Sequence, residues 1–390
     1  MVGGDTSIYM EKRFQSKSVA ESQDGLASTS SATIRRFALQ SAARDLVPRE
    51  GVARCMRAGH PREDGSWGVD VLYAPMKAAA HFGGVQCCRS VWLCPVCAAK
   101  ISERRRVDLA QGLDSWLTFA TGERRRVLLV TFTLQHERSD DLSVVFGALK
   151  RARKLLVGGR AAQQFGAEHS IVGMVRALEL THGQNGWHPH LHVLYFFNWD
   201  VPILPFEQAI KARWSDCVSA AGRYASWEHG CDVRFSDSDI SNYVAKWGKD
   251  PAWTTAHEMT KGVAKVARRK GRTPMQLLSD FLEGDAAAGR LWLQYAVNLK
   301  GERQLRWSNG LRDRCGLTAD KTDDELAIEQ DEVAIILASL TTGAWRVVLA
   351  NDARGQLLEC AASGDPAQVE TFLARLGIGA ASGFGTGWGM

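Results

Sequence analysis

Residues 186–196, GWHPHLHVLYF, place histidines at every second position: His188, His190 and His192. Alternate side chains of a β-strand point to the same face, so the three imidazoles share one face while Leu191 and its neighbours take the other. A strand-like run, SIVGMVRALELTH, precedes this one and is joined to it by Gly-Gln-Asn-Gly, which is typical of a β-hairpin. The chain must therefore accommodate an antiparallel strand pair with a histidine-bearing face.

The length of the turn decides which histidine faces Glu179 of the first strand. A two-residue Asn-Gly loop pairs Glu179 with His192, whereas a four-residue loop, residues 183–186, pairs it with His190. Both registers place Glu179 on the histidine face, and only a bulge or an odd loop reverses this. Two imidazoles and a carboxylate can then converge on one Mn²⁺, Mg²⁺ or Zn²⁺. The alternative is a hairpin whose histidines lie at the solvent edge without a metal.

Four of the nine cysteines crowd into residues 87–97. Their odd total and uneven spacing do not match the disulfide framework of a small secreted domain. Cys94 and Cys97 form a CxxC knuckle that is typical of a tetrahedral zinc site, and no thioredoxin-like pattern of strand and helix around it favours a redox pair. Zinc would fold a glycine-rich segment with little core of its own, and the remaining ligands must come from other cysteines or a histidine.

The composition, 45% apolar and 23% charged, is that of a globular protein. No apolar run approaches the roughly 18 residues of a membrane span, and the N-terminal residues lack the apolar core of a secretory signal, so we expect a cytoplasmic protein with no membrane partner. The net charge of +5 is uneven, with arginine triplets at 104–106 and 124–126 and an acidic segment at 320–332. The basic runs favour a polyanion partner, although solvated helix faces explain such runs equally well.

Composition and periodicity predict an α+β chain in four parts. Residues 1–45 are predicted to be disordered, and 46–122 to hold a zinc-binding segment and a basic helix. Residues 123–318 are predicted to form an antiparallel sheet flanked by helices, and 319–390 an acidic linker, a small α+β unit and a flexible tail. Within that unit, AWRVVLA and GQLLECA are predicted as a strand pair and DPAQVETFLARLG as a helix.

Three motifs in chain order resemble those of a known family. TFTLQH (131–136), GWHPHLHVL and YVAKWGK (243–249) look like the motifs of rolling-circle replication initiators of small bacterial plasmids. His190 and His192 match the histidine–apolar–histidine signature of the HUH endonuclease superfamily. With the cysteine segment, the resemblance covers residues 50–315. It implies a palm-like, RRM-like HUH nuclease domain that nicks and rejoins one strand of plasmid origin DNA.

The resemblance also implies a chemistry with a single catalytic tyrosine, Tyr243. Its oxygen would attack a phosphodiester of single-stranded origin DNA, keep the 5′-phosphate as a covalent ester and release a 3′-hydroxyl that primes synthesis. Because the bond energy is conserved in the ester, the strand can be rejoined without ATP. His190, His192 and Glu179 would hold the catalytic Mn²⁺ or Mg²⁺, which stabilises the charge on the phosphoryl oxygens.

Residues around Tyr243 would support that step. On a helix, Asp239, Tyr243 and Lys246 fall on one face. Lys246 could steady the phenolate or the scissile phosphate, and Lys249 could hold a neighbouring phosphate. In one branch of the family a glutamate four residues before the single tyrosine activates water. This sequence has the shorter aspartate there, so Asp239 is either the same general base or an ion-pair partner of a lysine. His136 matches the first motif, as a hydrogen-bonding neighbour of the site or a plain strand-end residue.

The family's spacing favours Cys88 over Cys87 as the ligand that precedes the CxxC knuckle. Cys55 is the expected fourth ligand, with His81 and Cys87 as alternatives. The basic helix that follows would turn its arginines towards DNA. The expected structural zinc ligands are Cys55, Cys88, Cys94 and Cys97, and the expected DNA-binding residues of the helix are Arg104, Arg105 and Arg106.

Two other functions remain open at this point. A relaxase or transposase would use the same chemistry, although no helicase or primase domain is visible after residue 315. A zinc-stabilised DNA-binding regulator without catalysis would use the histidines to hold a structural ion. The C-terminal unit is a candidate contact for a host helicase or a partner subunit, and its motifs do not choose between them.

Overall fold

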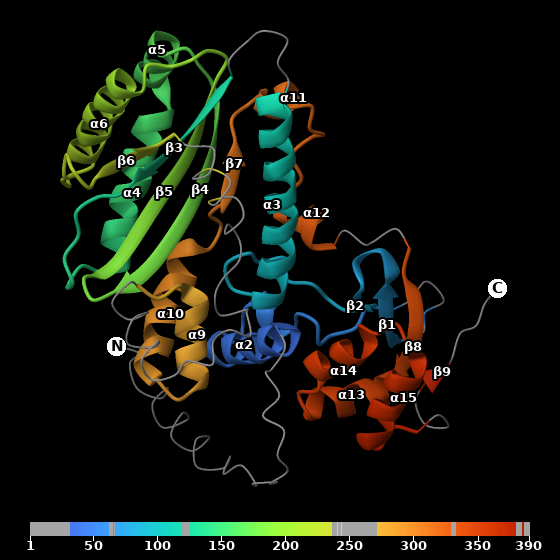
Figure 1. Ribbon diagram of the computed structural model, residues 1–390. Helices are drawn as coiled ribbons and strands as arrows, with labels where there is room; N and C mark the ends of the chain where they lie inside the picture. The colour runs from blue at the N-terminus through green and yellow to red at the C-terminus, as the bar shows by residue number, and fades with distance from the viewer. Residues whose placement is uncertain are drawn as a thin grey trace. The chain divides into compact units, whose positions relative to one another are not determined.

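The histidine hairpin lies at the centre of a five-stranded antiparallel sheet with the order β6-β3-β5-β4-β7 (Figure 1). The computed structural model describes residues 32–61, 65, 67–118, 125–235, 240, 243, 271–328, 333–379 and 384–385. The strands are β3 (Arg126–Phe132), β4 (Ile171–Gly183), β5 (Gly186–Phe197), β6 (Cys231–Arg234) and β7 (Leu305–Trp307). The predicted antiparallel sheet is therefore present.

The register of the hairpin is the one expected for the four-residue loop. Glu179 pairs with His190, and Gly183 pairs with Gly186, so only Gln184 and Asn185 turn the chain. Gly186 has a φ of +83°, a conformation that glycine adopts without strain, and a Cβ at this position would lie 3.1 Å from the carbonyl oxygen of Arg138. A glycine at the turn thus allows both the backbone geometry and the close approach of the neighbouring loop.

The two faces of the sheet are covered differently. Helices α4 (Leu142–Val157) and α6 (Ile203–Ala220) pack on the face of the odd-numbered β5 residues, as Figure 1 shows. On the other face, Leu194 and Phe196 pack against α3 (Pro95–Thr118). The histidines lie on this second face, beyond Leu194, and are only partly buried.

The remaining helices near this sheet follow local capping signals. Thr273 and Gln276 form a capping box at the start of the helix α9, where Pro274 stands at the first helical position. Asp285 caps α10, and the Trp187 indole of the hairpin donates to Gln294 of α10 at 2.8 Å. The bounds are α5 (Gly159–Glu168), α9 (Pro274–Leu282), α10 (Ala286–Leu299), α11 (Leu311–Arg314) and α12 (Asp323–Ile328).

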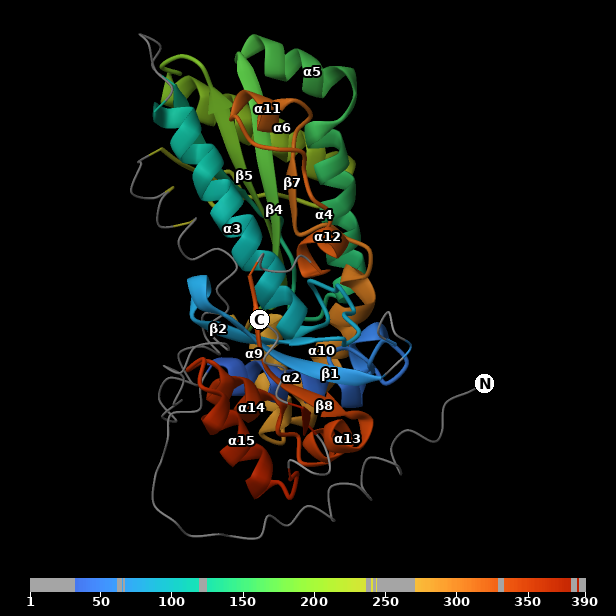
Figure 2. The ribbon, with the colours of Figure 1, turned by 90° about the vertical axis from the view of Figure 1, so that its right-hand side faces the viewer.

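A second sheet joins segments from both ends of the chain, in the order β2-β1-β8-β9 (Figure 2). Its strands are β1 (Gly68–Ala74), β2 (Ala79–Gly83), β8 (Ile335–Thr341) and β9 (Phe384–Gly385). Apolar residues of β1 and β8 share a core with α13 (Thr342–Ala350), α14 (Arg354–Ala361) and α15 (Pro366–Arg375). The parts predicted from the sequence, with boundaries at residues 122 and 319, place β1 and β8 in different units. The sequence prediction therefore does not include the pairing of these two strands.

Two predictions of local structure are wrong. The segments AWRVVLA and GQLLECA form α13 and α14, because their buried residues, such as Trp345 and Val348 or Leu357 and Ala361, recur at the three- and four-residue spacing of a helix. The disorder predicted for residues 1–45 is wrong from residue 32 onwards. There the helix α2 (Ala32–Leu46) buries side chains that include Phe37 and Leu39. Short 3₁₀ turns occupy Gly51–Ala53 and Pro75–Lys77.

Gly186→Ala tests the turn. The substitution should lower the free energy of unfolding by about 1–2 kcal/mol, because an alanine is strained at a positive φ. Gly166→Ala, in the helix α5, is the matched control. A Cβ added at Gly166 would have no heavy atom within 4 Å, so this substitution should leave stability unchanged or raise it slightly. Urea unfolding measures both, and equal effects of the two substitutions would contradict the turn argument.

Candidate active site and metal centre

The histidine face carries a row of aromatic rings that ends at Tyr243. Ring centroids lie 4.8 Å apart for His136 and His188, 4.0 Å for His188 and His190, and 5.9 Å for His190 and His192. The Tyr243 ring follows, 5.2 Å from that of His192. The third sequence motif thus contributes a phenol directly beside the predicted metal ligands.

Glu179 and Thr131 fix the orientation of His192 from both sides of its ring. The Glu179 carboxylate lies 2.8 Å from His192 Nε2, and the Thr131 hydroxyl lies 3.0 Å from Nδ1. A carboxylate only accepts, so Nε2 carries the proton here and Nδ1 accepts from Thr131. With a cation on Nε2 the other tautomer would form, and the Thr131 hydroxyl could then accept from Nδ1–H. Thr133 holds His188 Nε2 in a similar way, at 3.1 Å.

The protonation states suit cation binding. Burial lowers the pKa of His190 to about 3, so its imidazole is neutral at pH 7 and free to donate an electron pair. The hydrogen bond with His192 lowers the pKa of Glu179, which is therefore a carboxylate. Among the described residues, the buried His190 Nδ1 has no hydrogen-bond partner. The neutral His190 imidazole beside a carboxylate fits a divalent cation.

The possible ligand atoms of His190, His192 and Glu179 are spaced more widely than the sulfurs of a cluster of four cysteines. Within the described residues, the only group of three or more possible ligand atoms that all lie within 4.8 Å of one another is formed by Cys55, Cys88, Cys94 and Cys97. Glu179 is 52% exposed, and its carboxylate is bonded to His192 rather than drawn towards His190. A cation at this site would require the Glu179 side chain to rotate, which its exposure allows.

Tyr243 is enclosed and protonated in this arrangement. Its hydroxyl oxygen is buried and has no hydrogen-bond partner among the described residues. Burial raises the pKa of Tyr243 well above its ordinary value, and the negative charge of Glu179 adds to the effect. Ile240, one helical turn earlier, is buried in the core under α3. The predicted residues Asp239, Lys246 and Lys249 lie outside the described residues.

His136 lies at the opposite end of the row from Tyr243. Its ring is tilted by 48° to that of His188, and the two residues line a cavity of about 220 Å³ together with Thr133 and Asn185. Burial lowers the pKa of His136, and this effect outweighs that of a hydrogen bond with the Asn185 backbone, which raises the pKa. The His136 ring contacts His188. In the described residues it makes no hydrogen bond to His190 or His192, the predicted metal ligands.

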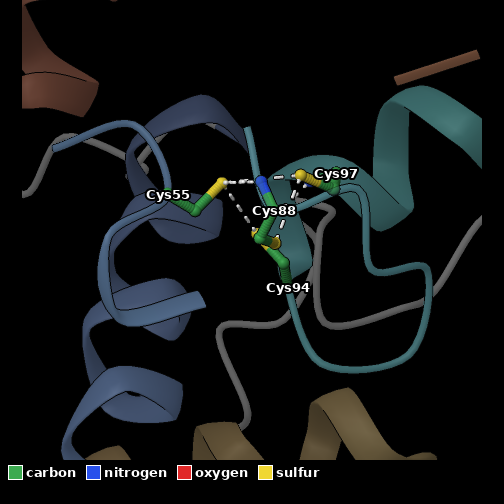
Figure 3. Close-up of side chains that lie close together, drawn as sticks. All are labelled: Cys55, Cys88, Cys94 and Cys97. Carbon is green, nitrogen blue, oxygen red and sulfur yellow. Dashed lines mark hydrogen bonds between the residues drawn. The ribbon is translucent and has the colours of Figure 1, made fainter. Parts of the chain in front are cut away.

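Four cysteine sulfurs form a second cluster, with their side chains directed towards one another (Figure 3). The Sγ of Cys97 lies 3.5 Å from that of Cys55 and 3.6 Å from that of Cys88, and Cys94 lies 3.7 Å from Cys55. Sulfurs bound 2.3 Å from one tetrahedral zinc would lie about 3.8 Å apart, whereas disulfide sulfurs lie about 2.05 Å apart. The cluster therefore has the spacing of a metal site and could hold a metal such as zinc.

These are the four cysteines expected from the sequence. Backbone N–H groups support two of the sulfurs, from Cys97 to Cys94 at 3.5 Å and from Cys88 to Cys55 at 3.3 Å. The alternative ligand Cys87 lies 3.5 Å from Cys97 but outside the group of four. The other alternative, His81, lines a separate cavity of about 470 Å³ beside Cys87.

The arginine triplet of α3 contacts protein rather than projecting freely. Arg105 is buried and forms an ion pair with Asp323 of α12, so its assignment to DNA binding is wrong in this arrangement. Arg104 donates to the Leu326 carbonyl at 2.9 Å, and Arg106 pairs with Glu103 one turn away. The acidic segment after residue 320 folds against the basic helix, a partnership between distant residues that local charge patterns do not reveal.

Sequence reasoning missed Thr131 and Thr133, which bind the histidine rings. Both lie in the TFTLQH motif, but only the pairing of β3 with β5 brings Thr131 opposite His192. Nothing in the local sequence predicts that pairing. None of the described helices is both long enough and apolar enough to cross a membrane.

Comparisons with known proteins find one family and two similar proteins. The profile of a family described as "Replication protein" matches residues 80–340, or 261 of 390 residues. The chain is 29% identical over 328 residues to "Protein rep" of Streptomyces lividans, covering 67% of this chain and 69% of that protein. It is 31% identical over 150 residues to "Neomycin resistance protein" of Streptomyces cyanogenus, covering 32% of this chain and 33% of that protein. No solved structure matches.

The family match contains both halves of the histidine site and three of the clustered cysteines. Cys55 precedes residue 80, and α13, α14 and α15 follow residue 340. One of the four clustered cysteines and the whole C-terminal helical segment are therefore outside the matched region.

Cys55→Ser should abolish tight metal binding by the cysteine cluster, because three thiolates hold a metal far more weakly than four. Cys87→Ser is the matched control: it removes the neighbouring thiol and should retain the metal. Elemental analysis of the full-length proteins after gel filtration measures the bound metal. Equal loss in the two variants would mean that the ligand set has been assigned incorrectly.

Proposed function

The chain belongs to the replication protein family, and from this premise we propose that it initiates rolling-circle replication of a plasmid by nicking one strand at the origin. The Tyr243 oxygen attacks the scissile phosphodiester, a P–O bond to the tyrosine forms, and the 3′-oxygen leaves as a free hydroxyl that primes synthesis. The 5′-phosphate stays on the protein, so a later 3′-hydroxyl can displace the tyrosine and close the strand.

The observation that carries this proposal is the placement of Tyr243 beside His192. Their ring centroids are 5.2 Å apart, and Glu179 is bonded to the same histidine at 2.8 Å. Tyr243, His192 and Glu179, which lie in three separate parts of the chain, are the proposed nucleophile and two of the proposed metal ligands. If the histidines had only a structural role, the buried Tyr243 hydroxyl beside them, which has no hydrogen-bond partner among the described residues, would remain unexplained.

His190, His192 and Glu179 would hold Mn²⁺ or Mg²⁺, which supplies fixed positive charge for the phosphoryl oxygens. Thr131 keeps the His192 ring in place. The charge of Glu179 contributes to the raised pKa of Tyr243, so neutralising that charge favours the phenolate. Asp239 remains either the general base for a final hydrolysis or an ion-pair partner, and Lys246 the residue that steadies the phenolate.

The cysteine cluster would serve as a structural zinc site beside the nuclease domain. Its role would be to fold the segment before α3, while Lys249 and the more exposed arginines of α3, Arg104 and Arg106, contact phosphates of origin DNA. A host helicase is the proposed partner that continues unwinding after the nick.

The test is the formation of a covalent protein–DNA adduct. The full-length protein is incubated with Mn²⁺ and a single strand of its plasmid origin labelled at the 3′ end, since the tyrosine keeps the 5′-phosphate of that fragment. A labelled band at the size of the protein is expected on a denaturing gel. Tyr243→Phe should lose it completely, while Tyr224→Phe, an exposed tyrosine of another loop, should keep it. Glu179→Gln should weaken the adduct most at limiting Mn²⁺.

Two results would contradict the proposal. An adduct that persists in Tyr243→Phe would assign the nucleophile to another residue. Specific binding of the origin by the wild-type protein without any adduct would instead favour a zinc-stabilised DNA-binding regulator. A relaxase or transposase would form the adduct with a transfer origin or a transposon end in place of the replication origin.

A further inference from the structure

Gln40 connects the cysteine cluster to a buried arginine of the C-terminal segment. The Gln40 side-chain amide donates to Cys94 Sγ at 3.1 Å, and its carbonyl accepts from Arg354 Nη1 at 2.7 Å. Gln40 is 1% exposed and Arg354 is fully buried. A guanidinium that polarises the amide carbonyl makes the amide N–H a stronger donor, so the positive charge acts on the sulfur through one intervening group.

Arg354 shares its carboxylate partner, Asp352, with a second guanidinium group. Asp352 accepts from both Arg354 and Arg57, each at 3.2 Å, so one half-exposed carboxylate serves two guanidinium groups. Burial lowers the pKa of Arg354, and Asp352, Cys55 and Cys94 act in the opposite direction. A buried cation requires a compensating anion. A divalent metal bound by four thiolates carries a net charge of −2 and would supply one.

The C-terminal helices also hold the backbone beside Cys55. Arg354 Nη1 donates to the Met56 carbonyl at 3.3 Å, and the Trp345 indole of α13 donates to the Arg57 carbonyl at 2.8 Å. Met56 has a φ of +52°, an unusual conformation for a residue with a side chain. These two bonds therefore fix a strained stretch of backbone immediately after a predicted ligand.

Close packing of α14 on α2 brings Arg354 and Gln40 together. A Cβ on Gly355 would lie 2.6 Å from the Cα of Ile34, so only a glycine permits this approach. The two helices lie side by side in both ribbon views (Figures 1 and 2). Gln40 and Arg354 both lie outside the region that the family profile matches.

We propose that the C-terminal helices complete the metal centre: Arg354, acting through Gln40, stabilises the metal-bound Cys94 thiolate. Arg354 is thus a positioning residue for the metal rather than a ligand, and the inference rests on the metal proposed for the cysteine cluster. Because coupling between two events is reciprocal, metal binding also stabilises the docking of α14.

The experiment compares zinc release from four full-length, zinc-loaded proteins: the wild type, Arg354→Met, Gln40→Glu and the control Arg375→Met. The control removes an exposed arginine from α15. Transfer of zinc to a colorimetric chelator should be about 10–100-fold faster in Arg354→Met and Gln40→Glu, and unchanged in the control. Gln40→Glu is the sharper variant, because its carboxylate can still bind Arg354 but cannot donate to Cys94 and adds negative charge beside the thiolate.

Hydrogen exchange of the wild-type protein provides a second measurement that needs no variant. Removal of zinc by a chelator should speed amide exchange in α14, residues 354–361, and leave the β4–β5 hairpin unchanged. Wild-type release rates in Gln40→Glu, or identical exchange of α14 with and without zinc, would overturn the proposal. A wild-type protein that binds no zinc would overturn the metal centre as well, whereas the outcome of the DNA adduct test bears on neither.

Discussion

Antiparallel pairing of β4 with β5 is the constraint on which the candidate active site depends. Its period of two places Glu179 and the histidines on one face while Leu191 and Val193 enter the core under α4 and α6. A slip of one residue would bury imidazoles in that core and expose large apolar side chains, at a cost of about 1.5–3 kcal/mol for each. Burial of the apolar face therefore fixes the register that places Glu179 and the histidines together on the polar face.

Local spacing predicted the part of this site that lies within one hairpin. The alternation of histidines and the position of Glu179 follow from strand geometry alone, whereas the choice between two registers depended on a turn in which Gly183 pairs with Gly186. The hydroxyl of Thr131 could not be predicted, because the neighbour of β5 in the sheet is a matter of strand order. Tyr243 was found through the resemblance of its motif, since its approach to the histidines involves segments far apart in the chain.

Predictions failed where the local sequence competes with packing. Val347 and Val348 favour a strand by propensity, yet Trp345 and Val348 are buried on one side of a helix that Thr341 caps. Arg105 stands in a run that suggests a polyanion, but its partner is Asp323 of the same chain. For Arg105 the deciding contact comes from a distant element, whereas for α13 the local spacing and cap outweigh the strand propensity of the valines.

The pairing of the two ends of the chain has a consequence for biosynthesis. Arg354 lies 314 residues after Gln40, a distance that a bacterial ribosome covers in roughly 15–60 s. During that interval β1 lacks β8, and the cysteine cluster lacks the bonds that Arg354 and Trp345 make to Gln40 and to the backbone beside Cys55. The nascent protein would meet the metal ions and oxidants around it before these contacts form. A message cut short before the codons for α13 and α14 would yield a product that keeps the β4–β5 hairpin and lacks the helices that contact Gln40 and the backbone beside Cys55.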